Sequence, residues 1–582
     1  MEVSTPFRLP RKTPFGLAEH FTEWATGLNK LDGFYAQRPA QCSTTDFLRF
    51  TLDILGIDYQ VVKGSLDNVP KQGATVIVAN HPLGCVEGVI LAELLLQVRS
   101  DVKILANQYL KTVPELDNLF IGVDAFNGKQ AHKANLKALR CAHRHLEQQG
   151  LLLLFPAGEV SQLVDSKTNR IEDKEWSRSV SALIKKSKAT TVPVFINGQN
   201  SKRFYLAGKV HSLLRTLMLG RELINKANQR IDISIGSEIK YKELHGLADE
   251  PLVNYLRLNT YLLKPEPSKA TLLNPFIEET AISPALPIER IIEDFSTIPQ
   301  KDHLLTNGDF EVYCTRAKHI PNILYEIGRL REINFRAAGE GTGKALDIDE
   351  FDPHYRHLFV WDKEQQCLVG AYRLGLVDGL IDKRGLDGLY SRTLFDYDHG
   401  FLNQMGKSIE LGRSVIAEQY QRSMGALLLL WKGIATFIHQ NPDYTHLFGP
   451  VSISNDYNQH TRQLLAQSMT LHHYDAQCAQ LVKPTHPLLT SVPLATSMLT
   501  ALGDIQLLSR VIARIDEGKS VPVLLRQYLA LNGKLVCFNV DPAFNDALDG
   551  LIVVDLRQIE LKTLARYMTK PHAEHYLRYH QK

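Results

Sequence analysis

Two groups of residues in this chain of 582 residues have types and spacing that suit acyl transfer. The first is His81 with Glu87, which suits a hydroxyl acceptor. The second combines an acidic stretch from Asp347 to Asp352 with Glu410 and Arg413, and it suits an amine acceptor. Two successive acylations of one molecule, first on nitrogen and then on oxygen, would give a double-chained lipid.

His81 follows an apolar run typical of a buried strand, in the stretch Asn80-His81-Pro82-Leu83-Gly84. A histidine in such a turn can deprotonate an acceptor hydroxyl when a carboxylate orients its ring. Glu87 supplies that carboxylate. An acyl-enzyme is unnecessary, because a thioester donor is already activated. Gly84 and Gly88 allow a substrate to approach the backbone closely.

These residues resemble the glycerolipid acyltransferase superfamily, whose first block is His-x4-Asp and whose third is Phe-Pro-Glu-Gly-Thr. The match extends over about residues 60–240, with Phe155-Pro156-Ala157-Gly158-Glu159 as the third block and Val192-Pro193-Val194 as the fourth. The resemblance implies that Phe155, Pro156, Gly158 and Glu159 contact the acceptor. The carboxylate Glu87 stands one position later than in the family, and the carboxylate of the third block moves to Glu159. Both departures favour an acceptor other than lysophosphatidate.

An amine must lose a proton before it attacks a thioester, so the second site needs acids that collect a cationic amino acid and a base. Asp347, Asp349 and Asp352 are the predicted collecting acids, and Glu410 is the predicted base. Arg373 and Arg413 are predicted to bind the carboxylate of the amino acid or a phosphate of the pantetheine arm.

The second group resembles the acyl-homoserine-lactone synthases and their relatives with a GNAT-like acyltransferase fold. In that resemblance Arg331 and Phe335 belong to a helical Arg-x3-Phe element, Arg373 to the strand after the acidic stretch, and Glu410-x2-Arg413 to the central strand. Ser414 completes the run Glu-Leu-Gly-Arg-Ser. The resemblance implies that these residues bind the substrate and that Glu410 and Arg413 act in catalysis.

The stretch Gln421-Arg422-Ser423-Met424-Gly425-Ala426 resembles a reduced form of the donor-binding turn of that fold. Arg422, Gly425 and Ala426 are therefore the predicted donor-binding residues, beside the first amides of a helix. Leu427 stands where the family has a small residue. An acyl carrier protein, which presents only a phosphopantetheine arm, is the favoured donor over free coenzyme A. No bound cofactor and no metal are expected.

Composition and charge narrow the partners and the compartment. Hydrophobic residues make up 44% and charged residues 22% of the chain, which is typical of folded globular domains. Residues 1–270 hold 35 Lys and Arg against 27 Asp and Glu, and the remainder holds 31 against 36. A basic front half suits an anionic membrane surface or an acidic carrier protein, and the absence of a nucleic-acid-binding motif makes nucleic acid the weakest candidate.

Peripheral attachment to the inner face of the cell membrane is the predicted location. The seven cysteines are odd in number and form no CxxC pair, which favours a reducing cytoplasm. The sequence shows no signal peptide and no apolar run long enough to span a bilayer. The segment from His211 to Arg221 interleaves Leu and Met with cations at helical spacing. It is predicted either to lie in an anionic headgroup layer, with Arg215 and Arg221 facing the lipid, or to pack as an ordinary helix.

The pattern of elements predicts an α/β glycerolipid-acyltransferase-type domain over 1–264, a proline-marked linker over 265–300 and a GNAT-like α/β domain over 301–582. Buried strands are predicted at 74–79, 151–155, 191–196, 357–361, 367–374, 408–414, 534–540 and 551–554, and helices at 131–149, 320–335 and 423–439.

The fusion resembles the bifunctional ornithine lipid synthases, and a late element, Pro522-x-Leu524-x3-Tyr528-Leu529, resembles the ornithine-lipid N-acyltransferases. This resemblance implies that the rear domain acylates the α-amine of ornithine with a 3-hydroxyacyl group, and that the front domain esterifies the 3-hydroxyl. Three alternatives stay open: another amino acid such as glycine, glutamine or lysine; a lysophospholipid acyltransferase with a non-catalytic rear domain; and a non-enzymatic, haemolysin-like membrane-binding protein.

Overall fold

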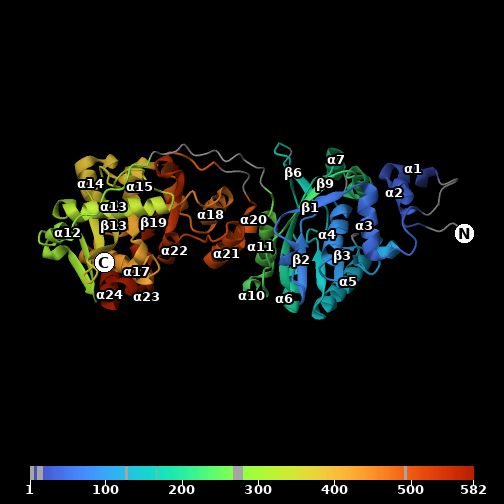
Figure 1. Cartoon of the computed structure of the whole chain (residues 1–582), viewed down its shortest axis with the longest axis horizontal. Helices are drawn as coiled ribbons and strands as arrows, with labels where there is room; N and C mark the ends of the chain where they lie inside the picture. The colour runs from blue at the N-terminus through green and yellow to red at the C-terminus, as the bar shows by residue number, and fades with distance from the viewer. Residues whose placement is uncertain are drawn as a thin grey trace. The chain divides into compact units, whose positions relative to one another are not determined.

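The computed structural model describes residues 5–9, 17–124, 129–165, 167–210, 212–265, 279–489 and 494–581. The chain packs into two compact units (Figure 1). The front unit is Met1–Ala270 with Ala495–Leu507, and the rear unit is Thr271–Leu494 with Leu508–Lys582.

The front unit is built on a seven-stranded sheet of order β1-β9-β8-β2-β5-β3-β4. Neighbouring strands are parallel, except that β8 and β9 are antiparallel. The strands are β1 Asp58–Lys63, β2 Thr75–Ala79, β3 Val102–Asn107, β4 Phe120–Val123, β5 Leu151–Leu154, β8 Thr190–Asn197 and β9 Arg230–Ile235. Every residue of β2 and β5 is buried, as expected for central strands of a parallel sheet with helices on both faces.

Helices α3 Thr44–Leu55 and α4 Cys85–Leu96 share one core with the sheet, in which Leu52 and Ile90 lie among Ile77 and Leu153. Helices α5 Lys129–Glu147, α6 Ser179–Ser187 and α11 Asp249–Tyr261 pack against one another and against the strands. The α/β domain predicted for the front half is thus present, with β2 and α4 joined by the short turn that holds His81.

The rear unit is built on an eight-stranded sheet of order β10-β11-β12-β13-β15-β16-β19-β18. Its strands are β10 His303–Asn307, β11 Phe310–Arg316, β12 Arg356–Asp362, β13 Cys367–Leu376, β15 Ser408–Ile416, β16 His446–Ile453, β18 Lys534–Asp541 and β19 Ala547–Asp555. All neighbours are antiparallel except β15 and β16, which run parallel and are paired only from Ser408 to Glu410. Beyond Glu410 the two strands separate.

Two long helices cover the two faces of this sheet. Phe359 of β12 belongs to the core beneath α13 Pro321–Ala337. Leu358, its neighbour on the strand, lies against Gly433 of α17 Met424–Gln440. Because successive side chains of a strand point to opposite faces, the sheet is sandwiched between α13 and α17.

All the strands and helices predicted from the sequence are present, with shifts of a few residues at their ends. Two features of the organisation were not predicted. Helix α12 Ile288–Phe295 lies within the range expected to be a linker and packs on α13 through the buried Ile291. The segment Ala495–Leu507 belongs to the front unit although the chain on either side of it belongs to the rear one. No helix of the described residues is long and apolar enough to cross a bilayer.

Candidate functional sites

The carboxylate of Glu87 joins the predicted base His81 to the start of helix α4. Backbone N–H groups of Leu83 and Gly84 donate to Oε1 of Glu87 at 3.0 and 2.8 Å. The same oxygen lies 2.8 Å from Nδ1 of His81, off the line of a well-formed hydrogen bond. Gly84 has a φ of 100°, a conformation that L side chains rarely adopt. The turn therefore fixes Glu87 and brings the pair together, as the sequence predicted.

Other groups hold His81 so that its ring reaches the surface of the unit. The ring stacks on Phe155, with 4.5 Å between centroids. The backbone N–H of His81 donates to Oδ1 of Asp173 at 3.1 Å, and its carbonyl accepts from the N–H of Ser161 at 2.7 Å. Its side chain is 18% exposed. With Nδ1 facing Glu87, Nε2 is the nitrogen left to accept a proton from a bound hydroxyl.

Asp173 is a supporting residue that the sequence analysis missed. Its carboxylate accepts hydrogen bonds from Oγ of Ser161 at 2.5 Å and from Nε1 of Trp176 at 2.9 Å. Burial raises the pKa of Asp173, although those donors and His81 oppose the rise. The sequence carries no signal for this contact, because Asp173 lies 92 residues from His81 in the chain.

The third block follows strand β5 and has a mixed role. Phe155 contacts the His81 ring, the carbonyl of Pro156 accepts from the N–H of Ser177 at 2.9 Å, and Gly158 turns the chain with a φ of 68°. Glu159 is paired with Lys174 at 2.5 Å and with Arg215. Burial opposes the charge of Glu159, but these two cations hold its pKa below the usual value. Because Glu159 forms ion pairs with both Lys174 and Arg215, we do not expect it to replace Glu87 as the partner of His81.

The pairing with Glu159 also bears on the segment from His211 to Arg221, for which membrane contact was one of two predictions. Arg215 lies on α8 Ser212–Leu217 and is buried, so its guanidinium is not available to a lipid headgroup. Arg221, on α9 Leu219–Asn225, is exposed. His211, where the expected segment begins, lies outside the described residues.

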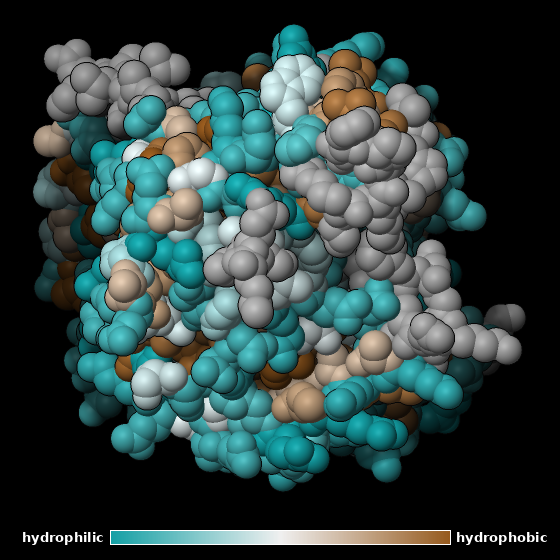
Figure 2. Space-filling view, turned by 90° about the vertical axis from the view of Figure 1, so that its right-hand side faces the viewer, coloured by the Kyte–Doolittle hydropathy of each residue, from teal (hydrophilic) through white to brown (hydrophobic). Residues whose placement is uncertain are grey.

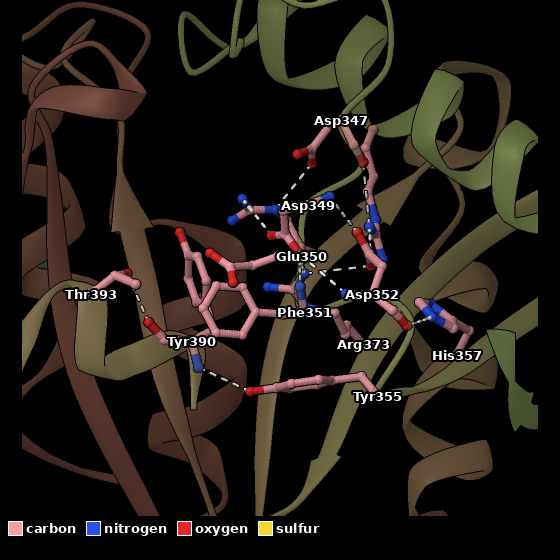
Figure 3. Close-up of polar contacts among 12 residues, drawn as sticks. Asp347, Asp349, Glu350, Phe351, Asp352, Tyr355, His357, Arg373, Tyr390 and Thr393 are labelled. Carbon is pink, nitrogen blue, oxygen red and sulfur yellow. Dashed lines mark hydrogen bonds and ion pairs between the residues drawn. The ribbon is translucent and has the colours of Figure 1, made fainter. Parts of the chain in front are cut away.

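In the rear unit, the predicted acidic residues pair with the predicted arginines (Figure 3). Arg331 donates to Asp352 at 2.9 Å, and Arg373 donates to Asp349 at 2.6 Å. Arg331, Asp352 and Arg373 are buried, and Asp349 is partly exposed. Although burial opposes its charge, Arg331 and Arg373 hold the pKa of Asp352 well below the usual range.

Arg413 completes this network. Its Nε lies 3.1 Å from Asp347 and its Nη2 lies 3.4 Å from Asp349. The three aspartates therefore neutralise three arginines, which is a different task from the predicted one of collecting a cationic substrate. Asp347 and Asp349 hold Arg413 directly, and the buried residues Arg331, Asp352 and Arg373 extend the network behind them.

Glu410 has an environment that does not suit the base predicted for it. Its carboxylate accepts from the hydroxyl of Tyr355, from the N–H of Tyr390 at 3.2 Å and from the N–H of Ser391 at 2.7 Å. The side chain is buried, and it does not line the cavity of this unit. Glu410 thereby anchors the segment that places Tyr390 against Arg413, whose guanidinium lies 4.6 Å from the Tyr390 ring.

An open cavity, with about 600 Å³ of empty space that includes adjoining solvent, lies where β15 and β16 separate. Arg413 stands at its wall with a φ of 50°, at a bulge in the pairing of β15 with β13. Strain of this kind is frequent where a side chain is aimed into a functional site. The predicted residues that line the cavity are Phe335, Arg413 and Ser414.

The cavity also has lining residues that the sequence analysis did not assign to a site, and they include three acids. They are Glu340, Tyr372, Tyr390, Leu411, Gly412, Pro450, Ser452, Leu524, Tyr528, Asp541, Phe544 and Asp549. Of these, Leu524 and Tyr528 belong to the late element noted in the sequence. The acids come from distant segments without a recognisable motif.

The predicted donor turn forms the start of helix α17. Ser423 caps this helix by accepting a hydrogen bond from the N–H of Gly425 at 3.2 Å. Gly425 and Ala426 line a second cavity together with Lys432, whereas Arg422 is exposed and is not among its lining residues. Helix N-terminal amides beside a lysine suit an anionic group. Among the described residues, no three His, Cys, Asp or Glu side chains are grouped so as to hold a metal.

Comparison with known proteins links each unit to acyl transfer. Residues 33–268 match the family model described as an acyltransferase, and residues 330–432 match the one described as an acetyltransferase (GNAT) domain. A glycine N(alpha)-acyltransferase of Phocaeicola vulgatus is 30% identical over 269 residues, which cover 43% of this chain and 81% of that protein. The corresponding protein of Bacteroides thetaiotaomicron is 30% identical over 267 residues, covering 43% and 78%.

A second kind of relative is an O-acyltransferase. The lyso-glycine lipid O-acyltransferase of Bacteroides thetaiotaomicron is 29% identical over 204 residues, which cover 34% of this chain and 71% of that protein.

Proposed function

Because this chain belongs to the acyltransferase family of the glycine N(alpha)-acyltransferases and joins an acyltransferase domain to a GNAT domain, we propose that it makes a double-chained ornithine lipid. The rear unit transfers a 3-hydroxyacyl group from a phosphopantetheine thioester to the α-amine of ornithine. The front unit then transfers a second acyl group to the 3-hydroxyl of that product. Each transfer releases one thiol and forms one bond, an amide first and an ester second.

The observation that carries this proposal is that one chain joins two different acyltransferase domains, each with a candidate site of its own. The His81–Glu87 pair supplies a base for a hydroxyl and has no counterpart in the rear cavity, which is lined by Arg413 and three acids. Relatives that act separately on nitrogen and on oxygen support the same division. We take an acyl carrier protein as the donor, with coenzyme A as the alternative, because the start of α17 offers amides and Lys432 to a single phosphate.

Membrane attachment forms part of the proposal, because both products are lipids. Helix α1 Leu17–Thr26 turns an apolar row outward, with Leu17, Phe21 and Trp24 69%, 67% and 65% exposed. The same helix buries Glu19 and Glu23, which is the reverse of a helix packed in a water-facing domain. Figure 2 faces the end of the front unit that carries this helix and shows hydrophobic groups among hydrophilic ones. We place this end against an anionic membrane on the cytoplasmic side.

Lipid analysis tests the proposal. A bacterial host without aminolipids is given the full chain, and its total lipids are examined by mass spectrometry. A lipid with an ornithine headgroup, one amide-linked 3-hydroxyacyl chain and one ester-linked chain is the expected product. A host that gains no aminolipid would refute the proposal.

Glycine is the second candidate for the acceptor, because the relatives named above act on it. The same experiment separates the two, since a glycine headgroup and an ornithine headgroup differ in mass.

A further inference from the structure

Three carboxylates that the proposed chemistry has not used meet in the rear cavity. Glu340 follows helix α13, Asp541 ends strand β18, and Asp549 lies on strand β19. All three are buried, with 4–8% of each residue exposed. Oγ of Ser452 donates to Glu340 at 2.9 Å, and Ser452 is the direct partner of Asp549 in the pairing of β16 with β19. This pairing brings acids from separate segments to one wall of the cavity.

Asp549 is the carboxylate of this group that has the fewest partners within the described residues. Its side chain lines the cavity and is buried, and within the described residues no hydrogen bond or ion pair engages its carboxylate. By contrast, Glu340 accepts from Ser452, and Asp541 accepts from the N–H of Ala543 at 2.9 Å. A buried carboxylate without a partner carries a large desolvation cost. A cationic ligand would remove that cost.

The protein itself supplies little positive charge to this wall. Arg413 is paired with Asp347 and Asp349. Arg462 donates to Oδ1 of Asn455 and to the carbonyl of Asp546, both at 2.6 Å. Burial, together with repulsion among the acids, raises the pKa of Asp549 well above its usual value and that of Glu340 to about 7. The acids on this wall therefore lack matching positive groups of the protein, and a cationic ligand would favour their ionised forms.

We infer that Glu340, Asp541 and Asp549 form the subsite for the side-chain ammonium of a diamino-acid acceptor and select such an acceptor over glycine. Phe335 and Phe544 lie edge to face at 6.4 Å in the same cavity, and the guanidinium of Arg413 lies 4.5 Å from the Phe544 ring, so this aromatic wall already accepts one cation. An ammonium group gains from aromatic faces as well as from carboxylates. Glycine has no side-chain cation and would leave Asp549 unpaired. The inference rests on the proposed N-acylation and adds which residues recognise the acceptor.

The test compares ornithine with glycine in the purified full chain, using a 3-hydroxyacyl thioester as donor. Wild-type protein is expected to acylate ornithine with the higher kcat/KM. Asp549→Asn is expected to lower kcat/KM for ornithine by about 10-fold to 100-fold, the usual effect of losing one charge-assisted hydrogen bond, and to change the value for glycine by less than about 3-fold. Asp443→Asn is the matched control, since Asp443 is half-exposed and paired with Lys407; it should leave both values unchanged.

Calorimetric titration without donor separates binding from chemistry. Ornithine and 1,4-diaminobutane should both bind the wild type and bind Asp549→Asn about tenfold more weakly. Equal kcat/KM for ornithine and glycine in the wild type, or an equal loss for both in Asp549→Asn, would overturn the inference. If the wild type acylates no amino acid, the proposed N-acylation fails. The titration then decides the subsite alone, and it overturns the subsite if ornithine binds both proteins equally.

If circular dichroism shows that Asp549→Asn does not fold, two other measurements test the subsite. They are the preference of the wild type for ornithine over glycine and the same preference in Glu340→Gln. Loss of selectivity for ornithine in Glu340→Gln supports the subsite, and unchanged selectivity overturns it.

Discussion

The hydroxyl of Tyr355 donates a hydrogen bond to Oε2 of Glu410, a buried residue that is not among those lining the rear cavity. Two backbone N–H groups, from Tyr390 and Ser391, complete the set of donors around this carboxylate. Glu410 therefore connects strand β15 to the segment that carries Tyr390. Its contribution to N-acylation is expected to act through the position of Tyr390 and Arg413.

Replacing Glu410 by Gln is expected to lower both the stability and the rate of N-acylation. An amide nitrogen would meet N–H donors that need an acceptor, and one unsatisfied buried group costs about 1–3 kcal/mol. Thermal unfolding of the variant measures this loss. Tyr355→Phe removes one of the three donors and should cost about 1 kcal/mol, with a smaller loss of rate. A Glu410→Gln protein with unchanged stability and no activity would instead identify Glu410 as the base.

Replacing His81 by Ala should stop the second acylation and leave the first intact. Loss of a general base typically lowers a rate by about 10²-fold to 10⁴-fold, so the single-chained N-acyl amino acid should accumulate in the lipid extract. Glu87→Ala should have a similar effect without compensation by Glu159, which is held by Lys174 and Arg215. Normal amounts of the double-chained lipid in the His81→Ala strain would refute the role of His81.

The raised pKa of Glu340 predicts a defined pH dependence of stability. Burial raises this pKa from 4.5 to about 7 in the folded protein, so the folded state holds a proton that the unfolded state has released. The stability contributed by the protonated Glu340 is fully present below pH 4.5 and is lost as the pH rises to about 7. The free energy of unfolding should fall by on the order of 3 kcal/mol across that window.

Comparison with Glu340→Gln isolates this contribution, because the other titrating groups occur in both proteins. The difference between wild type and variant in urea unfolding should change between pH 4.5 and 7 and be constant above it. Glu364→Gln, at an exposed position, is the control. A difference that is flat over the whole range would contradict the raised pKa.

The sequence predicts local relationships better than distant ones in this protein. His81 and Glu87 are six positions apart, across one strand-to-helix turn, and their contact follows from that turn. The positions of the buried strands along the chain also follow, because buried apolar runs such as β5 are recognisable from composition.

Contacts between distant segments carry no such signal. Asp173 reaches the backbone N–H of His81 across 92 positions of the chain, and Arg215 reaches Glu159 across 56 positions. The acid cluster of the rear cavity is of the same kind, since Asp549 acquires its setting from pairing with Ser452 on a different strand. The triplet Asp347, Asp349 and Asp352 shows the same limit of prediction from sequence. These acids were identified as site residues, but their pairing with arginines of the protein was not predicted.

The outward apolar row of helix α1 predicts how the front unit binds membranes. Changing both Phe21 and Trp24 to Ser should weaken binding to vesicles that contain anionic lipid by more than tenfold, since each large apolar side chain that leaves water contributes about 1.5–3 kcal/mol. Arg221→Glu should weaken binding mainly at low salt, where the Debye length is about 10 Å at 0.1 M. Charge reversal at the buried Arg215 should instead unfold the region around Glu159. Leu489→Ser, at an exposed apolar position of the rear unit, serves as the control in a vesicle co-sedimentation assay. If the Phe21 and Trp24 variant sediments like the wild type, membrane contact through α1 is excluded.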